Sequence, residues 1–231
     1  MTQFVVLCGG LGTRMVAVTG GGQKCLVPVG GRPFLAHVVD ALRCGAGDQV
    51  LLLAGHRAAD IEAFATGWRD APFGVDTVRQ SRPNGTIAAL REAAGLLSDE
   101  FVLVLGDVLP PRRTGPWRDL RAVLDTSGAL GVMATAPAEA SGDPGNVEAD
   151  GPRITRYGAG RDAPFIDRGC RLLRRVCLER QTGDTDRDFF GGLAASGRLA
   201  GCLIDEPIVE VGSPDRWEHA QRVLTQVGRQ S

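Results

Sequence analysis

The chain has 231 residues, 43% of them hydrophobic, which is enough for one large domain or two small ones, and we expect one. Its 26 Lys and Arg residues nearly balance 27 Asp and Glu residues, so no overall charge favours nucleic acid or a membrane surface as a partner. No apolar run reaches the ~20 residues of a membrane-spanning helix, and the first residues do not resemble a secretory leader, so the expected location is cytoplasmic.

Apolar runs that read as strands alternate with helical patterns over residues 1–136. Strands are expected at 4–8, 50–54, 75–79, 101–106 and 129–136, and helices within 33–47 and at 85–97 and 117–126. Strands that are apolar throughout are buried on both faces, as in the parallel sheets of α/β proteins. The order of these elements therefore predicts an α/β fold with a doubly wound, mostly parallel, Rossmann-like sheet.

Residues 137–212 have a less regular pattern. The stretch NVEADGPRITRYG (146–158) predicts a hairpin that turns at Asp150 and Gly151, and GCLIDEPIVEVG (201–212) predicts two short strands broken by Pro207. A last helix is expected with Ser213 as its N-cap, Pro214 as its first residue and Gly228 at its end.

The cysteines and histidines do not indicate covalent chemistry. The six cysteines form no C-x-x-C pair and are expected to be free thiols, not a disulfide framework or a zinc site. His37 follows Pro33 on a helical pattern and is expected to be a core or helix-face histidine. No covalent intermediate is therefore proposed.

The stretch FVVLCGGLGTRM (4–15) places three glycines and then Arg14 directly after the first strand. Ligands of open α/β sheets bind at the carboxyl ends of strands, and glycines there let backbone N–H groups approach phosphate oxygens. Lys24 adds a second cation ten residues later. The loop matches neither standard glycine-rich phosphate pattern, so an ordinary tight turn is the alternative interpretation.

Longer blocks make the pattern specific. Gly9 to Arg14 read G-G-x-G-T-R, and residues 24–33 read K-x-L-x-P-V-x-G-x-P, which together resemble the opening of the sugar-phosphate nucleotidylyltransferases. The blocks NGTIAAL (84–90), LVLGDV (103–108) and VEVGSPDRW (209–217) resemble three further family blocks in the same order. The compact length, the G-T turn and I-D-x-G at 166–169 are most similar to the heptose 1-phosphate guanylyltransferases.

The resemblance implies a single nucleotidyltransferase domain, in which residues 1–136 bind the nucleotide, 137–212 form a small sugar-binding part and 213–231 form a C-terminal helix. The implied nucleotide-binding residues are Leu7, Gly9, Gly10, Gly12, Thr13, Arg14, Asn84, Gly85, Thr86 and Asp107. The implied sugar-binding residues are Lys24, Gly145, Asn146, Asp167 and Asp186.

Arg14 and Lys24 are the expected catalytic cations. The planar fork of Arg14 suits the β- and γ-phosphates, and Lys24 is a point charge for the attacking phosphate or the α-phosphate. Mg²⁺ prefers oxygen ligands, and Asp107 is the first candidate. Glu210 stands where the family has an aspartate and is the second. The simpler interpretations are a turn residue for Asp107, a solvated charge for Lys24, and a carboxylate near a helix N-terminus for Glu210.

The implied reaction is attack of a sugar 1-phosphate on the α-phosphorus of a nucleoside triphosphate, with release of pyrophosphate. GTP and a heptose 1-phosphate are favoured, because backbone carbonyls around residues 81–85 can accept hydrogen bonds from guanine. The alternatives are uridylyl or another nucleotidyl transfer to a hexose or amino-sugar 1-phosphate, and a catalytically silent nucleotide sensor. The sensor is considered because Glu210 replaces an aspartate and the family's E-K-P is absent. Homo-oligomerisation is left open.

Overall fold

The computed structural model describes residues 1–81, 85–111, 116–160, 162–204 and 206–227. Within these ranges one sheet contains the strands β1 (Gln3–Cys8), β4 (Gln49–Ala54), β5 (Gly74–Arg79), β6 (Glu100–Leu105), β7 (Gly131–Pro137), β8 (Val147–Asp150), β9 (Arg153–Tyr157), β10 (Phe165–Arg174) and β11 (Leu199–Leu203). Their order across the sheet is β5-β4-β1-β6-β10-β7-β11-β9-β8. A separate hairpin joins β2 (Pro28–Val29) to β3 (Arg32–Pro33).

The first half of the sheet is parallel, as the sequence predicts. β5, β4, β1 and β6 run in one direction, with Val5 of β1 between Leu51 of β4 and Leu103 of β6. β1, β4 and β6 are almost wholly buried, which is why each of them is a continuous apolar run. The carboxyl ends of these strands therefore meet at one edge of the sheet.

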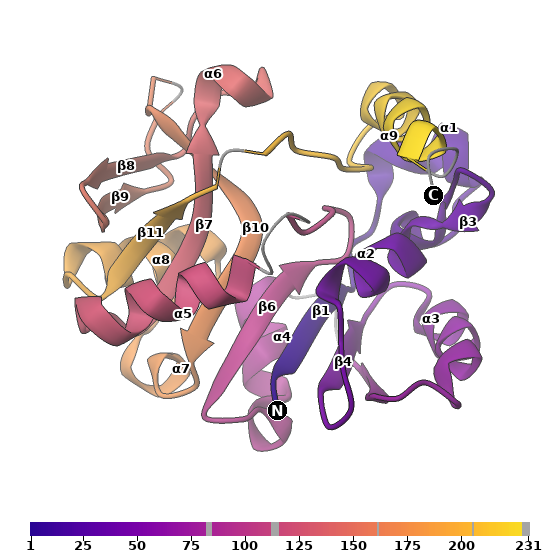
Figure 1. Cartoon of the computed structure of the whole chain (residues 1–231), viewed down its shortest axis with the longest axis horizontal. Coiled ribbons are helices and arrows are strands. Elements are labelled where there is room, and N and C mark those ends of the chain that lie inside the picture. Colours follow the sequence, from indigo (N-terminus) through magenta and orange to yellow (C-terminus); the bar gives the residue numbers. More distant parts are fainter. Residues whose placement is uncertain (82–84, 112–115, 161, 205, 228–231) are drawn as a thin grey trace.

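β10 reverses the direction of the sheet. It is antiparallel to both β6 and β7, whereas β11 is parallel to β7. A register shift between Asp167 and Arg171 bulges β10 around Gly169, whose φ is +68°. Such a bulge bends the strand and redirects its side chains. The second half of the sheet is therefore mixed, and it forms the left part of Figure 1.

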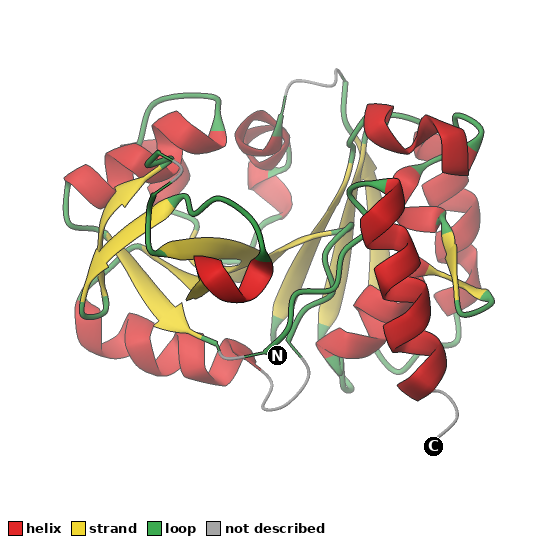
Figure 2. Cartoon of the chain, turned by 90° about the horizontal axis from the view of Figure 1, so that it is seen from above, coloured by secondary structure: helices red, strands yellow, loops and turns green. Residues whose placement is uncertain are grey.

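Helices cover both faces of the sheet (Figure 2). The longer ones are α2 (Phe34–Leu42), α3 (Ala58–Ala65), α4 (Thr86–Glu92), α5 (Pro116–Ser127), α8 (Asp186–Ala195) and α9 (Pro214–Val227). Single turns form α1 (Val16–Thr19), α6 (Ala138–Ser141) and α7 (Cys177–Arg180), and the 3-10 turns are η1 (Thr13–Met15), η2 (Lys24–Leu26), η3 (Thr66–Trp68) and η4 (Ala94–Leu96).

Two hydrophobic cores lie on opposite faces, because successive side chains of a strand point to opposite sides of a sheet. Phe4 and Val6 of β1 belong to one core, together with α2, α3, α5 and α9. Val5 belongs to the other, together with α4, α7 and α8. α9 thus returns to the first half of the molecule, where it packs on the β2–β3 hairpin (Figure 1).

Some expected elements differ from those observed. The helix expected at 85–97 ends at Glu92 and continues only as η4, and the first long helix ends at Leu42, with Arg43 and not a glycine in the left-handed conformation at φ +52°. The second strand expected in 201–212 is wrong: Glu210 forms only an isolated bridge to Val108. The hairpin at Asp150 and Gly151 is confirmed, and Gly228 lies outside the described residues.

The segment from Ile204 to Ser213, described except for residue 205, crosses from the second half of the molecule back to the first (Figure 1). Arg168, in the bulge of β10, is 2% exposed and holds this segment. Its guanidinium donates hydrogen bonds to the backbone oxygens of Ile204 at 3.1 Å, of Glu206, and of Pro207 at 3.1 Å. A buried cation therefore fixes the path by which the chain reaches Glu210.

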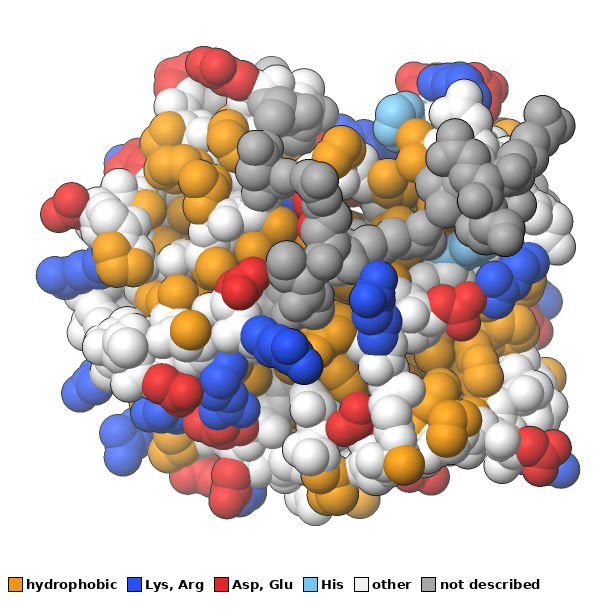
Figure 3. Space-filling view, in the orientation of Figure 1, with side chains coloured by type: hydrophobic (Ala, Val, Ile, Leu, Met, Phe, Trp, Pro, Cys, Tyr) orange, Lys and Arg blue, Asp and Glu red, His pale blue; other side chains and the backbone are white. Residues whose placement is uncertain are grey.

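The cysteines are all free thiols, and His37 is a buried residue whose Nε2 lies 2.9 Å from the backbone oxygen of Val29; both expectations are confirmed. None of the helices within the described ranges combines the length and the apolar character that crossing a membrane requires. On the face drawn in Figure 3, charged side chains of both signs are interspersed, as the net charge of −1 implies.

Candidate active site

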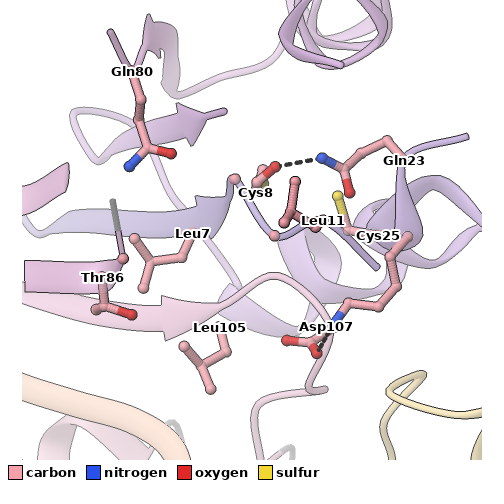
Figure 4. Close-up of a pocket in the computed structure, with 13 residues that line it drawn as sticks. Leu7, Cys8, Leu11, Gln23, Cys25, Gln80, Thr86, Leu105 and Asp107 are labelled. Atoms are coloured by element: carbon pink, nitrogen blue, oxygen red, sulfur yellow. Dashed lines mark hydrogen bonds and ion pairs between the residues drawn. The ribbon is translucent and has the colours of Figure 1, made fainter. Parts of the chain in front are cut away.

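A cavity of about 270 Å³ opens at the carboxyl ends of β1, β5 and β6. It is lined by Leu7, Cys8, Gly9, Gly10, Leu11, Gln23, Lys24, Cys25, Gln80, Gly85, Thr86, Leu105 and Asp107 (Figure 4). Seven of the residues proposed from the sequence are in this set: Leu7, Gly9, Gly10, Lys24, Gly85, Thr86 and Asp107. Segments that are distant in the sequence thus meet at the edge where parallel α/β sheets bind ligands.

The glycines of the opening loop allow close approaches that a side chain would block. A Cβ on Gly9 would lie 2.1 Å from Oε1 of Gln80, so Gly9 leaves the room that the Gln80 amide occupies. Gly12 has φ +61°, and a Cβ there would lie 3.1 Å from Cβ of Lys24. The loop therefore has a backbone shape that favours glycine, and Lys24 packs directly against it.

Lys24 and Asp107 form an ion pair, drawn as a dashed line in Figure 4. Their side chains are only 18% and 24% exposed, so Lys24 is not the solvated surface charge of the simpler interpretation. Lys24 comes from η2 and Asp107 follows β6, two segments that are distant in the sequence. The pair places one cation and one carboxylate in the lining of the cavity, next to the glycine loop.

Gln23 fixes the backbone around the cavity. Its buried side chain donates hydrogen bonds to the backbone oxygens of Cys8 at 2.6 Å and of His56 at 2.7 Å. A hydrogen bond with Cys25, together with burial, raises the pKa of the Cys8 thiol well above its ordinary value. Cys8 therefore stays protonated and does not act as a nucleophile.

Glu210 lies next to the end of β6 because of backbone pairing. The N–H of Leu109 donates to the oxygen of Val209 at 2.8 Å, and the N–H of Val211 donates to the oxygen of Asp107 at 2.9 Å. Burial raises the pKa of the Glu210 carboxyl, and the charges of Asp107 and Asp143 add to this rise, whereas Arg216 opposes it. The two expected metal carboxylates are therefore close enough to influence one another electrostatically.

Arg14 lies beside this second carboxylate. A Cβ on Gly212 would be 2.7 Å from Oε1 of Glu210 and 3.6 Å from Nη2 of Arg14. Among the described residues, Gly12, Thr13 and Arg14 are beyond the cavity lining, at the start of η1. Each of the two carboxylates thus has a cation nearby: Lys24 pairs with Asp107, and Arg14 lies near Glu210.

The two carboxylates suit a hard divalent cation. Mg²⁺ is usually held by one or two carboxylates and completed by phosphate and water oxygens, which matches Asp107 and Glu210. No group of three or more His, Cys, Asp or Glu side chains with metal-binding geometry occurs in the part of the chain that the structure describes. Phosphate oxygens would have to complete the coordination of a metal bound here.

Of the five residues proposed for the sugar, Lys24 lines the cavity of the first half, whereas Gly145, Asn146, Asp167 and Asp186 lie in the second half, outside the cavity lining. The N–H of Asp167 donates to Oδ1 of Asn146 at 2.9 Å, and Gly145 packs so tightly that a Cβ would lie 1.7 Å from the oxygen of Ala163. The Asp167 carboxylate, 4% exposed, accepts hydrogen bonds from Arg171, from the hydroxyl of Tyr157 at 3.2 Å and from the N–H of Gly169 at 2.9 Å.

Arg171 joins Asp167 to Asp186, whose Oδ2 is 3.4 Å from Nη2 of Arg171. The guanidinium also lies 4.3 Å from the ring centroid of Phe190. Burial alone would lower the pKa of Arg171, but Asp167, Tyr157 and Asp186 raise it above the ordinary value. Asp167 is thus held by internal partners. Gly169, two residues later, packs against Leu105 of the cavity lining, since a Cβ on Gly169 would be 2.9 Å from Cδ1 of Leu105.

The sequence analysis missed Gln80, Gln23, Arg171 and Arg216, and one proposed residue, Asn84, lies outside the described residues. The place of Gln80 in the site could have been predicted from the sequence. Gln80 directly follows β5, so its place at the carboxyl edge of a parallel strand follows from the fold. The other three have no motif of their own in the sequence, and their contacts form only in the folded chain.

The sequence matches the MobA-like NTP transferase domain over residues 4–182. The chain belongs to this family. Its relatives are sugar-phosphate nucleotidyltransferases, which confirms the resemblance found in the sequence. The chain is 27% identical over 205 residues to the mannose-1-phosphate guanylyltransferase of Mycobacterium tuberculosis, covering 84% of this chain and 55% of the relative. It is 32% identical over 202 residues to the bifunctional protein GlmU of Sphingopyxis alaskensis, covering 82% and 40%.

The chain spans about half or less of the length of these curated relatives. Solved structures show the same fold over its whole length. A UTP-bound UGPase from Acinetobacter baumannii has a TM-score of 0.80 at 18% identity, covering 100% of this chain and 98% of that chain. HddC from Yersinia pseudotuberculosis complexed with GMP-PN has a TM-score of 0.76 at 19% identity, covering 97% and 100%. The α/β Rossmann-like nucleotidyltransferase fold is therefore confirmed.

Proposed function

We propose that the chain is a Mg²⁺-dependent nucleotidyltransferase that joins a nucleoside triphosphate and a sugar 1-phosphate into a nucleotide sugar and releases pyrophosphate. The observation that carries this proposal is the meeting of the glycine loop, Lys24 and Asp107 around one cavity. The family membership supports the same class of reaction.

The reaction brings two anionic groups together, so the protein has to position them and neutralise their charge. Lys24 exchanges its contact with Asp107 for phosphate oxygens when the substrates bind. Arg14 binds the departing pyrophosphate with its planar guanidinium. Asp107 and Glu210 would hold Mg²⁺, which would stabilise the negative charge that develops on the transferred nucleotidyl group and on the pyrophosphate. The buried Cys8 and Cys25 take no part in bond formation.

GTP is the favoured nucleotide, because the guanylyltransferase relative supports it. The Gln80 amide, which points toward the cavity in Figure 4, both donates and accepts hydrogen bonds, so it suits either guanine or uracil. A heptose or related sugar 1-phosphate stays the proposed acceptor. Gly145, Asn146, Asp167 and Asp186 are its proposed binding region, with Asp167 oriented by Arg171.

A pyrophosphate-release assay over five nucleoside triphosphates and a panel of heptose, mannose, glucose and amino-sugar 1-phosphates tests the proposal. We expect the fastest release with GTP. A preference for UTP or dTTP would replace the guanylyl assignment by the uridylyl or thymidylyl alternative.

The catalytically silent sensor makes a different prediction in the same assay. A sensor would bind GTP in isothermal titration calorimetry, yet release no pyrophosphate with any of the sugar 1-phosphates. That combination would overturn the enzymatic proposal.

A further inference from the structure

Arg216, in the first turn of α9, contacts two carboxylates from different parts of the molecule. Its Nη1 is 2.9 Å from Oε1 of Glu210, and its Nη2 forms an ion pair with Asp143. Glu210 is the second carboxylate of the metal site proposed above. Asp143 belongs to the loop of residues 142–146, which also contains Gly145 and Asn146 of the proposed sugar-binding region. One guanidinium therefore bridges the two substrate regions.

Hydrogen bonds hold the backbone in place on both sides of this bridge. On the side of α9, Nε1 of Trp217 donates to the backbone oxygen of Pro28 at 2.9 Å, and the N–H of Gly30 donates to Oε1 of Gln221 at 2.7 Å. On the other side, the N–H of Asn146 donates to the backbone oxygen of Phe165 at 2.9 Å, next to the tightly packed Gly145. The three side chains are 23% to 32% exposed, so solvent only partly screens their charges.

The position of Arg216 is unfavourable in itself. The N-terminal turn of a helix carries partial positive charge, which repels a cation. The two carboxylates offset this repulsion, so the stability of the Arg216 contacts depends on both of them. If Glu210 turns to a metal, Arg216 keeps only Asp143 and pairs with it more strongly, which fixes the loop of residues 142–146. A sugar bound to this loop in turn keeps Arg216 with Asp143 and weakens the hold of Arg216 on Glu210.

We propose that Arg216 is a positioning residue that couples the loop of residues 142–146 to Glu210, so that binding of the sugar 1-phosphate and binding of the metal depend on each other. The inference rests on the proposed function. Thermodynamic linkage requires the coupling to be reciprocal: the sugar 1-phosphate changes the metal affinity by the same factor as the metal changes the affinity for the sugar 1-phosphate.

The test measures this factor on the full chain. The Kd of Mn²⁺ is determined by electron paramagnetic resonance in the presence of an analogue of the preferred nucleotide with a methylene group between its α- and β-phosphates. The measurement is repeated with the sugar 1-phosphate that releases pyrophosphate fastest in the panel above. For the wild type we expect this sugar 1-phosphate to tighten Mn²⁺ binding by about fivefold or more, the usual lower range of coupling between sites.

Three variants and one control follow. Arg216→Ala and Asp143→Asn should each reduce the factor to about one, and the double variant should reduce it no further, because both changes break the same bridge. Arg216→Lys keeps the charge without the planar fork and should retain part of the coupling. Arg222→Ala, an exposed position on the same helix, is the matched control and should behave as the wild type.

A factor near one in the wild type, or a factor that persists in either Arg216→Ala or Asp143→Asn, would overturn the coupling. A merely structural role would lower the Tm of the variants and leave the factor unchanged, which also counts against the inference. The proposed function fails separately, through the absence of pyrophosphate release by the wild type.

Discussion

Lys24 and Asp107 show how single residues prepare the cavity for anionic ligands. Lys24 packs against Gly12, and Asp107 lies where β6 ends, so the two charges neutralise one another until a ligand separates them. Lys24 is then ready to exchange one anionic partner for another. The pair is worth little to stability, since a partly exposed ion pair contributes about 0–1 kcal/mol. The role that we propose for it is in binding and catalysis.

Asp107→Asn tests the metal assignment. The amide keeps the shape of the carboxylate but loses its charge, so we expect kcat/KM to fall by about 100-fold or more. The Tm should change little, because the lost ion pair is weak. Asp70→Asn, at an exposed position, is the control. Unchanged turnover of Asp107→Asn would remove Asp107 from the metal site.

Gln80→Leu tests the proposed base contact. The leucine keeps the bulk of the side chain and removes its hydrogen-bonding amide from the cavity. One hydrogen bond contributes about 0.5–1.5 kcal/mol, so the KM for the preferred nucleotide should rise by up to about tenfold with little change in kcat. Gln226→Leu, on the exposed side of α9, serves for comparison. Equal KM values in both variants would place the base elsewhere.

At the scale of elements, β10 connects the two halves of the sheet, and charged residues hold it on either side. At its end, Arg174 pairs with Glu100 of β6, and Glu100 also binds Arg121 of α5. Burial would raise the pKa of the Glu100 carboxyl, but the two arginines outweigh burial and lower it. Two strands and a helix are thus joined through one carboxylate.

Glu100→Gln should destabilise the protein in a pH-dependent way. A carboxyl whose pKa is lowered by folding contributes stability above its unfolded pKa, and this contribution is lost as the pH falls through the folded pKa. At pH 7 we expect the free energy of unfolding to fall by about 0.5–1 kcal/mol, or the Tm by about 1–4 °C, for this partly exposed group. In strongly acidic solution, thermal unfolding should show no difference from the wild type. Glu218→Gln, at an exposed position, should show no such trend.

The contact between the loop 142–146 and the segment before β10 allows a matched pair of glycine variants. A Cβ on Gly145 would meet the backbone oxygen of Ala163 at 1.7 Å, whereas a Cβ on Gly160 has nothing within 4 Å. Gly145→Ala should therefore lower the free energy of unfolding by about 1–3 kcal/mol, and Gly160→Ala should be nearly neutral. Chemical denaturation of both variants measures this. Equal stabilities would mean that the loop relaxes without cost.

At the scale of the whole molecule, the sequence predicted one half better than the other. β1, β4 and β6 are apolar runs because the sheet buries them on both faces, so their sequence pattern identifies them as strands. β10 is buried too, yet it contains Asp167, Arg168 and Arg171, and its polar pattern conceals a strand. Arg171 pairs with Asp167, and Arg168 donates hydrogen bonds to the backbone oxygens of Ile204 and Pro207, contacts that only the folded chain contains.

The same distinction applies to the candidate site. The glycine loop, Lys24 and Asp107 could be proposed because each belongs to a local motif beside a strand or turn. Arg216 could not, because its partner Asp143 is 73 residues away in the sequence and only the folded chain brings Asp143 to the Arg216–Glu210 pair. Local chemistry is thus readable from the sequence, whereas the bridge between the two halves follows from tertiary structure.

The segment held by Arg168 has a consequence for synthesis on the ribosome. β1, β4 and β6 emerge early, and domains can begin to fold while later residues are still being added. Glu210 and α9 emerge after the strand that supplies Arg168. A nascent chain that has completed the sheet would therefore still lack Glu210, one of the two proposed magnesium carboxylates. The complete site assembles only when the later segment returns to the first half of the molecule and pairs with the end of β6.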